Sequence, residues 1–320
     1  HKVHKQKSYA LDVLAKNSKV DGRRLASLDI AFMIAPQLNA LGRLDDSRDA
    51  VRFLISSSFD DVDRVGKVLK EMNESRKKVE RGIYEEIDGT IFRKEIDLDT
   101  ENIIMAASDK WPAGVIGLVA GKLMHNYGKP AILFHADKKG IVRGSCRSIP
   151  EFDIFDALED NKDLLISFGG HSHAAGLKLK QADVAEFKAR LEKRIIDLVA
   201  TEDLQPKVEL DAPLELAEMT KKLLDDLDRM EPFGNKNRQP TFLVKDVVQL
   251  HAPKLLKDLH VKISVFSNGV LKPVIFFNRP DLYPIFRELG DKSFDLAGHV
   301  MKNEWNGQTR IELQGLDISL

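Results

Sequence analysis

The 320-residue sequence has a single cysteine, Cys146, so it can form no disulfide bond within itself. One cysteine is typical of a protein in a reducing compartment, and we expect a cytoplasmic location. The sequence also lacks any apolar run near the roughly 20 residues that span a bilayer. It shows no signal peptide. A membrane partner is therefore not expected.

Neither sign of charge dominates, because the formal net charge is −1. The protein as a whole does not attract polyanions, so any nucleic-acid surface must be local. Hydrophobic residues make up 43% of the chain and charged residues 31%, which suits a globular protein with a substantial core. The length allows two or three domains. The first residue is His1 rather than Met, and we expect the sequence to begin inside a longer or processed protein.

The most informative stretch runs from Gly144 to Gly176. It opens with Gly-Ser-Cys-Arg-Ser and closes with Gly-Gly-His-Ser-His-Ala-Ala-Gly. Glycine lets a backbone approach a ligand closely, and hydroxyls, a guanidinium and an imidazole supply the donors that hold a phosphate. We predict that both ends fold into one phosphate site. Its candidate residues are Ser145, Arg147, Ser148, Gly169, Gly170 and His171. The alternative is a tight turn with close packing and a structural histidine.

Positive charge is concentrated beside this stretch. Between Lys110 and Arg147 there are seven Lys or Arg residues and one Asp. Such an excess is what binding along a nucleic-acid backbone requires. Lysines on the outside of a helix would give the same count, so the charge supports the phosphate site without proving it.

The first 100 residues have helical patterns. We expect a helix within 1–30, a buried segment at 25–35 that ends at Pro36, and a helix at 45–55 with Ala50, Phe53 and Leu54 packed inward. Residues 59–87 have apolar residues at three- and four-residue steps, which predicts one long amphipathic helix.

Residues 101–195 alternate between strand and helix patterns. Strands are expected at 102–107, 131–134, 141–145 and 177–179, and helices at 115–125 and 182–198, with a short helix between 150 and 168. The alternation predicts a mostly parallel or mixed sheet flanked by helices.

Residues 206–320 have the pattern of a β-barrel. Strand patterns occupy 241–250, 260–266, 270–277, 294–302 and 310–318, and a helix is expected at 281–288. Five strands with one helix suit an OB fold, which binds single strands through basic groups and stacking aromatics. His260, Lys262 and Trp305 are candidates for that role. Phe276 is also aromatic, but it is the most readily explained as core.

Several motifs resemble those of the DHH phosphoesterases. Residues 169–176 resemble the GGHxxAAG signature of their DHH-associated domain. Residues 145–148 resemble its SGRS element, with Cys146 in place of glycine, and 111–121 resemble WHxGVIGIVAG, with Pro112 in place of histidine. Two further segments are similar to the RecJ family: 35–44 resembles APRINAAGR, with Gln37 in place of arginine, and 231–240 resembles EPFGxxNxxP.

The resemblance implies an α/β DHH-associated domain preceded by a helical connector and followed by a β-barrel OB-fold domain. The expected boundaries are 1–98, 99–200 and 205–320, with the helix from residue 59 as connector. The resemblance also implies that Asn39 and Arg43 face the active cleft and touch the DNA backbone. From the residues alone, a helix start with a surface arginine is the simpler interpretation.

The activity implied is that of a single-stranded-DNA-specific 5′→3′ exonuclease of DNA repair and recombination. In it Arg147 and Ser145 would anchor the 5′-phosphate, while His171, with Gly169 and Gly170, would bind the phosphate being cleaved. The family implies Mn²⁺ or Mg²⁺ held by an Asp-His-His-containing domain. This sequence has no Asp-His-His, so we expect that domain upstream and this fragment to be inactive alone. Single-strand-binding protein and a helicase are implied as partners.

Two other functions stay open. The chain could be a non-catalytic single-strand-binding or replication accessory module, which loss of the upstream metal motifs would indicate. It could also be a DHH phosphodiesterase for short oligonucleotides or cyclic dinucleotides. Such relatives share the GGH domain but generally lack the segment at 35–44 and an OB-like tail.

Overall fold

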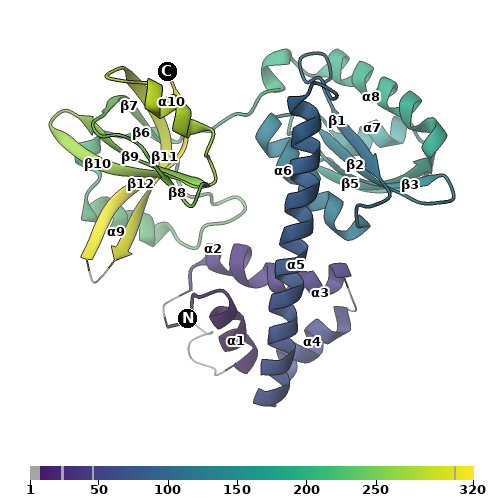
Figure 1. The fold of residues 1–320 in the computed structure, drawn as a ribbon, viewed down its shortest axis with the longest axis horizontal. Coiled ribbons are helices and arrows are strands. Elements are labelled where there is room, and N and C mark those ends of the chain that lie inside the picture. Colours follow the sequence, from purple (N-terminus) through teal and green to yellow (C-terminus); the bar gives the residue numbers. More distant parts are fainter. Residues whose placement is uncertain (1–7, 23–24, 45–46, 306–307) are drawn as a thin grey trace. The chain divides into compact units, whose positions relative to one another are not determined.

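The computed structural model describes residues 8–22, 25–44, 47–305 and 308–320. The chain forms two compact units (Figure 1): one holds residues up to 25 and 29–207, and the other holds residues 26–28 and 208–320. We describe each unit by itself. None of the described helices is both long and apolar enough to cross a membrane.

The first unit begins with short helices around one long helix. They are α1 (Tyr9–Asn17), α2 (Ser27–Asp29, shared between the units), a π-helical turn η1 (Ile30–Ile34), α3 (Ala35–Leu44), α4 (Ser47–Ile55) and α5 (Phe59–Phe92). The hydroxyl of Ser58 caps α5 by accepting from Asp61 N–H. Along its length α5 contributes to two cores. Val62 and Leu69 pack with α1 and α4, whereas Ile83 and Ile87 pack beside α6.

The expected buried segment at 25–35 was wrong. The chain continues in helical form from η1 through Pro36, and Ile30, Phe32 and Met33 are exposed. A π turn, closed by Ala35 N–H to Ile30 O, precedes Pro36. Proline has no N–H to donate, and Pro36 lies where the i→i−5 hydrogen bonding of the π turn gives way to the i→i−4 bonding of α3. Leu54 was also expected to point inward, but it is exposed because α4 buries only the face that carries Phe53.

Gln37, which stands where the family motif has arginine, is buried in this helical part. Its Nε2 donates to Leu14 O at 3.1 Å, Met33 O at 2.9 Å and the Ser18 hydroxyl at 2.7 Å. Its Oε1 accepts from Asn17 Nδ2 at 3.2 Å. The amide therefore holds α1 against η1 and α3.

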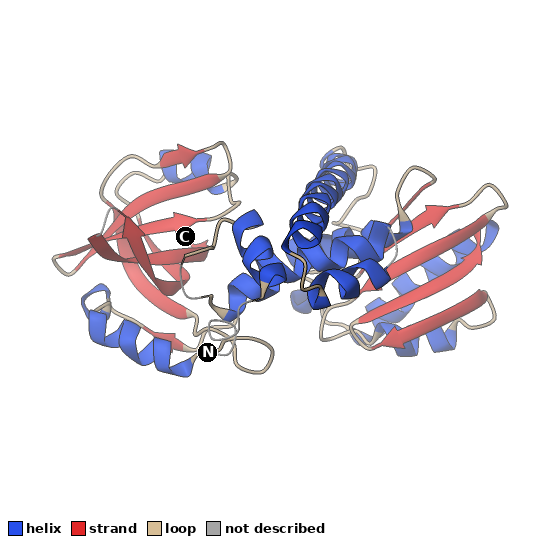
Figure 2. Cartoon of the chain, turned by 90° about the horizontal axis from the view of Figure 1, so that it is seen from below, coloured by secondary structure: helices blue, strands red, loops and turns tan. Residues whose placement is uncertain are grey.

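The rest of the first unit is a five-stranded mixed sheet with helices. Its elements are β1 (Ile104–Ser108), α6 (Ala113–Tyr127), β2 (Ala131–Ala136), β3 (Ile141–Arg147), α7 (Ile154–Asp160), β4 (Leu165–His171), β5 (Ala174–Lys180), η2 (Gln181–Asp183), α8 (Val184–Leu198) and η3 (Thr201–Asp203). The strand order is β1-β2-β3-β5-β4, with β1 and β2 parallel and the other pairs antiparallel. Helices lie on both faces of the sheet. Residues of β1 and β2 pack with α6 on one face, and residues of β2, β3 and β5 pack with α7 and α8 on the other, where Figure 2 shows helices behind the strands.

The structure departs from the predicted sheet at one edge. The short helix expected between 150 and 168 is present only as α7, and residues from Leu165 form the edge strand β4. The run Leu-Ile-Ser-Phe before two glycines is too short for a helical turn pattern, and pairing with β5 decides its conformation.

The second unit is a closed barrel. Its elements are β6 (Ala212–Pro213), η4 (Leu216–Glu218), α9 (Lys221–Met230), β7 (Phe242–Gln249), β8 (Lys254–Leu256), β9 (His260–Ser267), β10 (Val270–Phe276), α10 (Leu282–Glu288), β11 (Ser293–Trp305) and β12 (Gln308–Ser319). The order β7-β11-β12-β10-β9 closes through a β7–β9 pairing, and β10 and β12 are parallel. All five predicted strands are present. Phe276 is fully buried in the core, as expected.

Candidate phosphate site and nucleic-acid interface

Two rows of residues run across β3, β5 and β4. Arg147 is paired with Ala174, which is paired with His171. In the next row of the same face, Ser145 is paired with Gly176 and Gly176 with Gly169. Directly paired residues of antiparallel strands point to the same side of a sheet. The polar side chains therefore flank a floor of small residues. We call this set the phosphate cradle: Ser145, Arg147, Gly169, His171, Ala174 and Gly176.

One wall of the cradle lies against α6. A Cβ on Gly117 would lie 2.6 Å from Ser145 Oγ and 3.2 Å from Arg147 Nη2, so only glycine lets these polar groups approach the helix. Arg147 Nη1 donates to Cys146 O at 2.6 Å and to Ser145 Oγ at 3.3 Å. These contacts fix the guanidinium at the C-terminal end of the central strand β3, beside the serine hydroxyl.

The other wall is the turn between β4 and β5. His171 Nδ1 accepts a hydrogen bond from His173 N–H at 3.3 Å, which in the neutral ring leaves the proton on Nε2 as a donor. The turn is tied to the segment after β3, because Ser148 N–H donates to His173 O and Ile154 N–H to Ser172 O, both at 3.0 Å. The two ends of the 144–176 stretch are thus held together.

The backbone conformation at residue 170 requires glycine. Its φ is +152°, and a Cβ there would lie 2.4 Å from Ala174 O. Gly169, by contrast, has open space around its Cβ position and is exposed. Gly170 shapes the turn, and Gly169 keeps the floor of the cradle open.

Two expectations for this stretch change with the structure. Ser148 is buried, and its hydroxyl donates to Phe152 O at 2.6 Å, so it shapes the loop and does not line the cradle. Cys146 points to the opposite face of β3 from Ser145 and Arg147, into the core with α7 and α8. The cysteine that replaces the family glycine therefore does not narrow the cradle.

The chemistry of the cradle suits an anion. β3, β4 and β5 contain no Asp or Glu, and Mg²⁺ or Mn²⁺ prefers carboxylate and other oxygen ligands. Within residues 8–22, 25–44, 47–305 and 308–320, no group of three or more His, Cys, Asp or Glu could hold a metal ion. The cradle residues do not fit a divalent ion, but they fit a phosphate, which takes hydrogen bonds from hydroxyl, guanidinium and imidazole groups.

The two candidates near the N-terminus lie on α3. Asn39 is exposed. Arg43 belongs to the same helix, but its side chain is outside the described residues.

In the barrel, His260 is placed beside a second aromatic side chain. Its Nδ1 accepts from Asn278 N–H at 3.0 Å, and its ring meets Phe277 edge-on at 5.4 Å between centroids. Phe277 is 40% exposed. The pair offers an aromatic surface at the end of β10.

Lys262 is not a free cation. Its Nζ lies 3.3 Å from Oε2 of Glu312, a carboxylate that is only 2% exposed and also accepts from Asn303 Nδ2. Lys262 therefore neutralises a buried charge, and its role in DNA binding stays a prediction. The side chain of Trp305 is outside the described residues.

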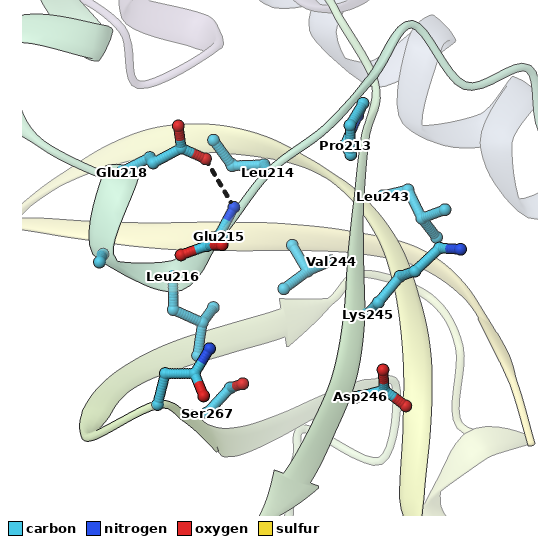
Figure 3. Close-up of a pocket in the computed structure, with 12 residues that line it drawn as sticks. Pro213, Leu214, Glu215, Leu216, Glu218, Leu243, Val244, Lys245, Asp246 and Ser267 are labelled. Atoms are coloured by element: carbon cyan, nitrogen blue, oxygen red, sulfur yellow. Dashed lines mark hydrogen bonds between the residues drawn. The ribbon is translucent and has the colours of Figure 1, made fainter.

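A hollow of about 600 Å³ beside β7 has a different character (Figure 3). It is lined by apolar residues and by Glu215, Glu218, Asp246 and Lys245. Three carboxylates against one ammonium disfavour a polyanion, so this hollow is not part of the nucleic-acid interface.

Sequence reasoning missed β4, the role of Gly117 and the exposed Phe277. Period-2 alternation in Ala-Ala-Gly-Leu-Lys-Leu-Lys, residues 174–180, indicates which face of β5 is open. No sequence signal places Gly117 against Ser145, because that contact depends on how α6 packs on the sheet.

Comparison with known domains defines the class of protein. The DHHA1 domain matches residues 100–197, and the RecJ OB domain matches residues 210–317. The chain is therefore an α/β DHHA1 domain followed by an OB-fold domain.

The relatives specify it further. It is 29% identical to "Single-stranded-DNA-specific exonuclease RecJ" of Bacillus subtilis, over 91% of this chain and 37% of that protein. It is 28% identical to the protein of the same name from Salmonella typhimurium, over 95% of this chain and 53% of that protein. The fold matches RecJ from Thermus thermophilus in complex with Mn²⁺, with a TM-score of 0.81 at 24% identity, over 99% of this chain and 44% of that one. The chain is RecJ-like, and it spans between about a third and about half the length of these relatives.

Proposed function

We propose that this chain is the strand-binding part of a RecJ-like, single-stranded-DNA-specific 5′→3′ exonuclease that acts in DNA repair and recombination. The observation that carries the proposal is the phosphate cradle, in which Arg147, Ala174 and His171 share one cross-strand row. The similarity to RecJ over more than nine-tenths of the chain supplies the reaction. As functional parts we propose a connector at 1–98, the phosphate-binding domain at 99–200 and the OB domain at 205–320.

Within the cradle the residues have separate roles. Arg147 and Ser145 anchor the 5′-phosphate of the strand, through the guanidinium and the hydroxyl that lie against α6. His171 donates from Nε2 to the phosphate being cleaved, and Gly169 lets the DNA backbone approach the sheet closely. Donors placed on developing negative charge stabilise the transition state. Asn39 and Arg43 face the active cleft and contact the DNA backbone.

The metal chemistry belongs to another domain. Mn²⁺ or Mg²⁺ would be held by an Asp-His-His-containing domain that this sequence does not include, since the cradle does not fit a divalent ion. Exposed apolar side chains support a covering domain at the N-terminal helices: Phe32 is 71% and Ile55 76% exposed. Under this proposal the protein is cytoplasmic, and single-strand-binding protein and a helicase are its partners.

The test is a gel assay with a labelled 5′-phosphorylated single-stranded oligonucleotide and Mn²⁺. This chain is run beside a version extended upstream by the Asp-His-His-containing domain. We expect cleavage by the extended version only. Cleavage by this chain alone would overturn the placement of the metals. Binding without cleavage by either version would favour a non-catalytic accessory module.

A variant of the extended version tests the cradle. Arg147→Ala should slow cleavage by about 10²-fold or more, because losing the 5′-phosphate anchor displaces the phosphate being cleaved, and a displacement of about 1 Å can cost about 10²-fold. Lys193→Ala, an exposed cation on α8 and outside the basic segment 110–147, is the control and should cleave at the original rate. Equal rates for the two variants would count against the cradle.

A further inference from the structure

The open face of β3, β5 and β4 carries positive charge beyond the cradle. β5 alternates strictly: Ala175, Leu177 and Leu179 are buried, while the residues between them are exposed. Arg143 is exposed on β3, two residues before Ser145 and on the same face. The exposed cations of this face are Arg143, Lys178 and Lys180.

Arg143 and Lys178 form a like-charge pair. They are directly opposite each other in the antiparallel register of β3 and β5. Among the described residues neither side chain has an ion pair. Asp137 is the carboxylate whose pKa Arg143 affects. The pKa of Asp137 is lowered mainly by the hydrogen bond from Ile141 N–H and less by the charge of Arg143. Like charges directly opposite on neighbouring strands are destabilising, so the chain places two cations together at a cost to its own stability.

The position of the pair fits a polyanion that already occupies the cradle. Arg143 and Ser145 lie on β3, and their partners on β5 are Lys178 and Gly176, respectively. Arg143 and Arg147 are four residues apart, about 13 Å along an extended strand. That separation exceeds the size of one phosphate group, so a single phosphate cannot contact both arginines. A nucleic-acid strand lying along β3 and β5 would bring a second phosphate to the pair while the first is in the cradle.

We propose that Arg143 and Lys178, with Lys180 beside them, form a second phosphate subsite for the backbone of a single-stranded nucleic acid. This rests on the function proposed above, because it takes the cradle as the first phosphate site. A bound phosphate neutralises both positive charges, so binding removes the repulsion between Arg143 and Lys178 that is present in the free chain. The subsite reads no base, so it contributes equally to every sequence.

The test measures the affinity of this chain for two 5′-phosphorylated probes, a thymidine dinucleotide and an oligothymidine of about 15 nucleotides. The double variant Arg143→Gln/Lys178→Gln should bind the long probe about tenfold more weakly and the dinucleotide as before. The salt dependence of long-probe binding should become shallower, by about 0.7 in the logarithmic slope for each phosphate that the variant no longer neutralises. The melting temperature should stay the same or rise, since the repulsion is removed.

Two controls separate this subsite from the proposed function. Lys138→Gln/Lys139→Gln removes the same charge from the exposed turn before β3 and should affect binding less than the double variant does. Arg147→Gln should weaken the binding of both probes. If the two double variants weaken binding of the long probe equally while Arg147→Gln still weakens binding of both probes, the second subsite is wrong and the cradle stands. If Arg147→Gln changes the affinity for neither probe, the proposals of the cradle and of the subsite are both wrong.

Discussion

Cys146 and Arg147 are neighbours in β3, and their side chains point to opposite faces of the sheet. Arg147 reaches the open face beside Ser145, whereas Cys146 is fully buried with α7 and α8. The substitution of cysteine for the family glycine is therefore a matter of core packing.

This geometry predicts an unreactive thiol. Burial raises the pKa of Cys146 to about 12, and reactivity requires an accessible thiolate. At pH 8 a thiol reagent should label the native chain very slowly and label one equivalent in denaturant. Cys146→Ala should leave the affinity for single-stranded DNA unchanged. Rapid labelling of the native chain, or a loss of affinity, would place Cys146 in the cradle after all.

Gln37→Leu should destabilise the first unit by about 1–3 kcal/mol. The substitution removes the Nε2 donor to the buried Leu14 O and to Met33 O, and it removes the Oε1 acceptor of Asn17 Nδ2. Urea denaturation measures the change. Asn39→Ala, at an exposed position of the same helix, should change the free energy of unfolding by no more than about 0.5 kcal/mol. A similar effect of both substitutions would contradict the structural role of Gln37.

The Lys262–Glu312 pair predicts an asymmetry between its two partners. Lys262→Met leaves the Glu312 carboxylate buried without its counter-charge and should cost about 1–3 kcal/mol of stability. Glu312→Gln should cost less, because Lys262 is partly exposed and water can solvate its ammonium. Denaturation of both variants tests this, and a larger loss for Glu312→Gln would refute the argument.

His260 and Phe277 predict a stacking contact for a base. Stacking on an aromatic side chain is worth about 1–3 kcal/mol per base, so Phe277→Ala should weaken binding of a long single strand by about tenfold. Leu271→Ala removes an exposed apolar side chain elsewhere on β10 and serves as the control. Fluorescence anisotropy of labelled DNA gives both affinities. Equal affinities of the two variants would remove Phe277 from the interface.

Tyr127 predicts a loss of stability at alkaline pH. Burial, and then the hydrogen bond to Asp88 at 2.5 Å, raise the pKa of Tyr127 well above its usual range. In the unfolded chain a tyrosine loses its proton near pH 10. Its contribution to stability is therefore complete below about pH 10 and falls as pH rises further, because only the unfolded phenol ionises readily.

The measurement is the urea midpoint between pH 8 and about pH 11. Tyr127→Phe should be less stable at pH 8, by about 1 kcal/mol for the lost hydrogen bond, and should show a weaker decline above pH 10. Tyr283→Phe, in the barrel, should decline as the original chain does. Parallel curves for the original chain and Tyr127→Phe would show that this phenol does not titrate on unfolding.

Much of the fold was readable from local patterns. The apolar stripe of residues 59–87 predicted α5, and the alternation in 241–318 predicted the five barrel strands, because burying one face imposes a period on the sequence. Pairing decided the conformation of 165–171, which has no period of its own and became β4. Helix packing decided the exposure of Phe32 and Leu54, since a helical pattern does not tell which apolar residues a neighbour covers.

The same division holds for the candidate site. The sequence by itself determined the kinds of group at the cradle, because glycine, serine, arginine and histidine at 144–176 carry their chemistry wherever they lie. Only the tertiary structure decided which of them act together. The register of β3, β5 and β4 brings Arg147 and His171 into one row, sends Cys146 and Ser148 inward, and sets Arg143 opposite Lys178. Those relations arise from strand pairing between residues far apart in the chain, which no local pattern encodes.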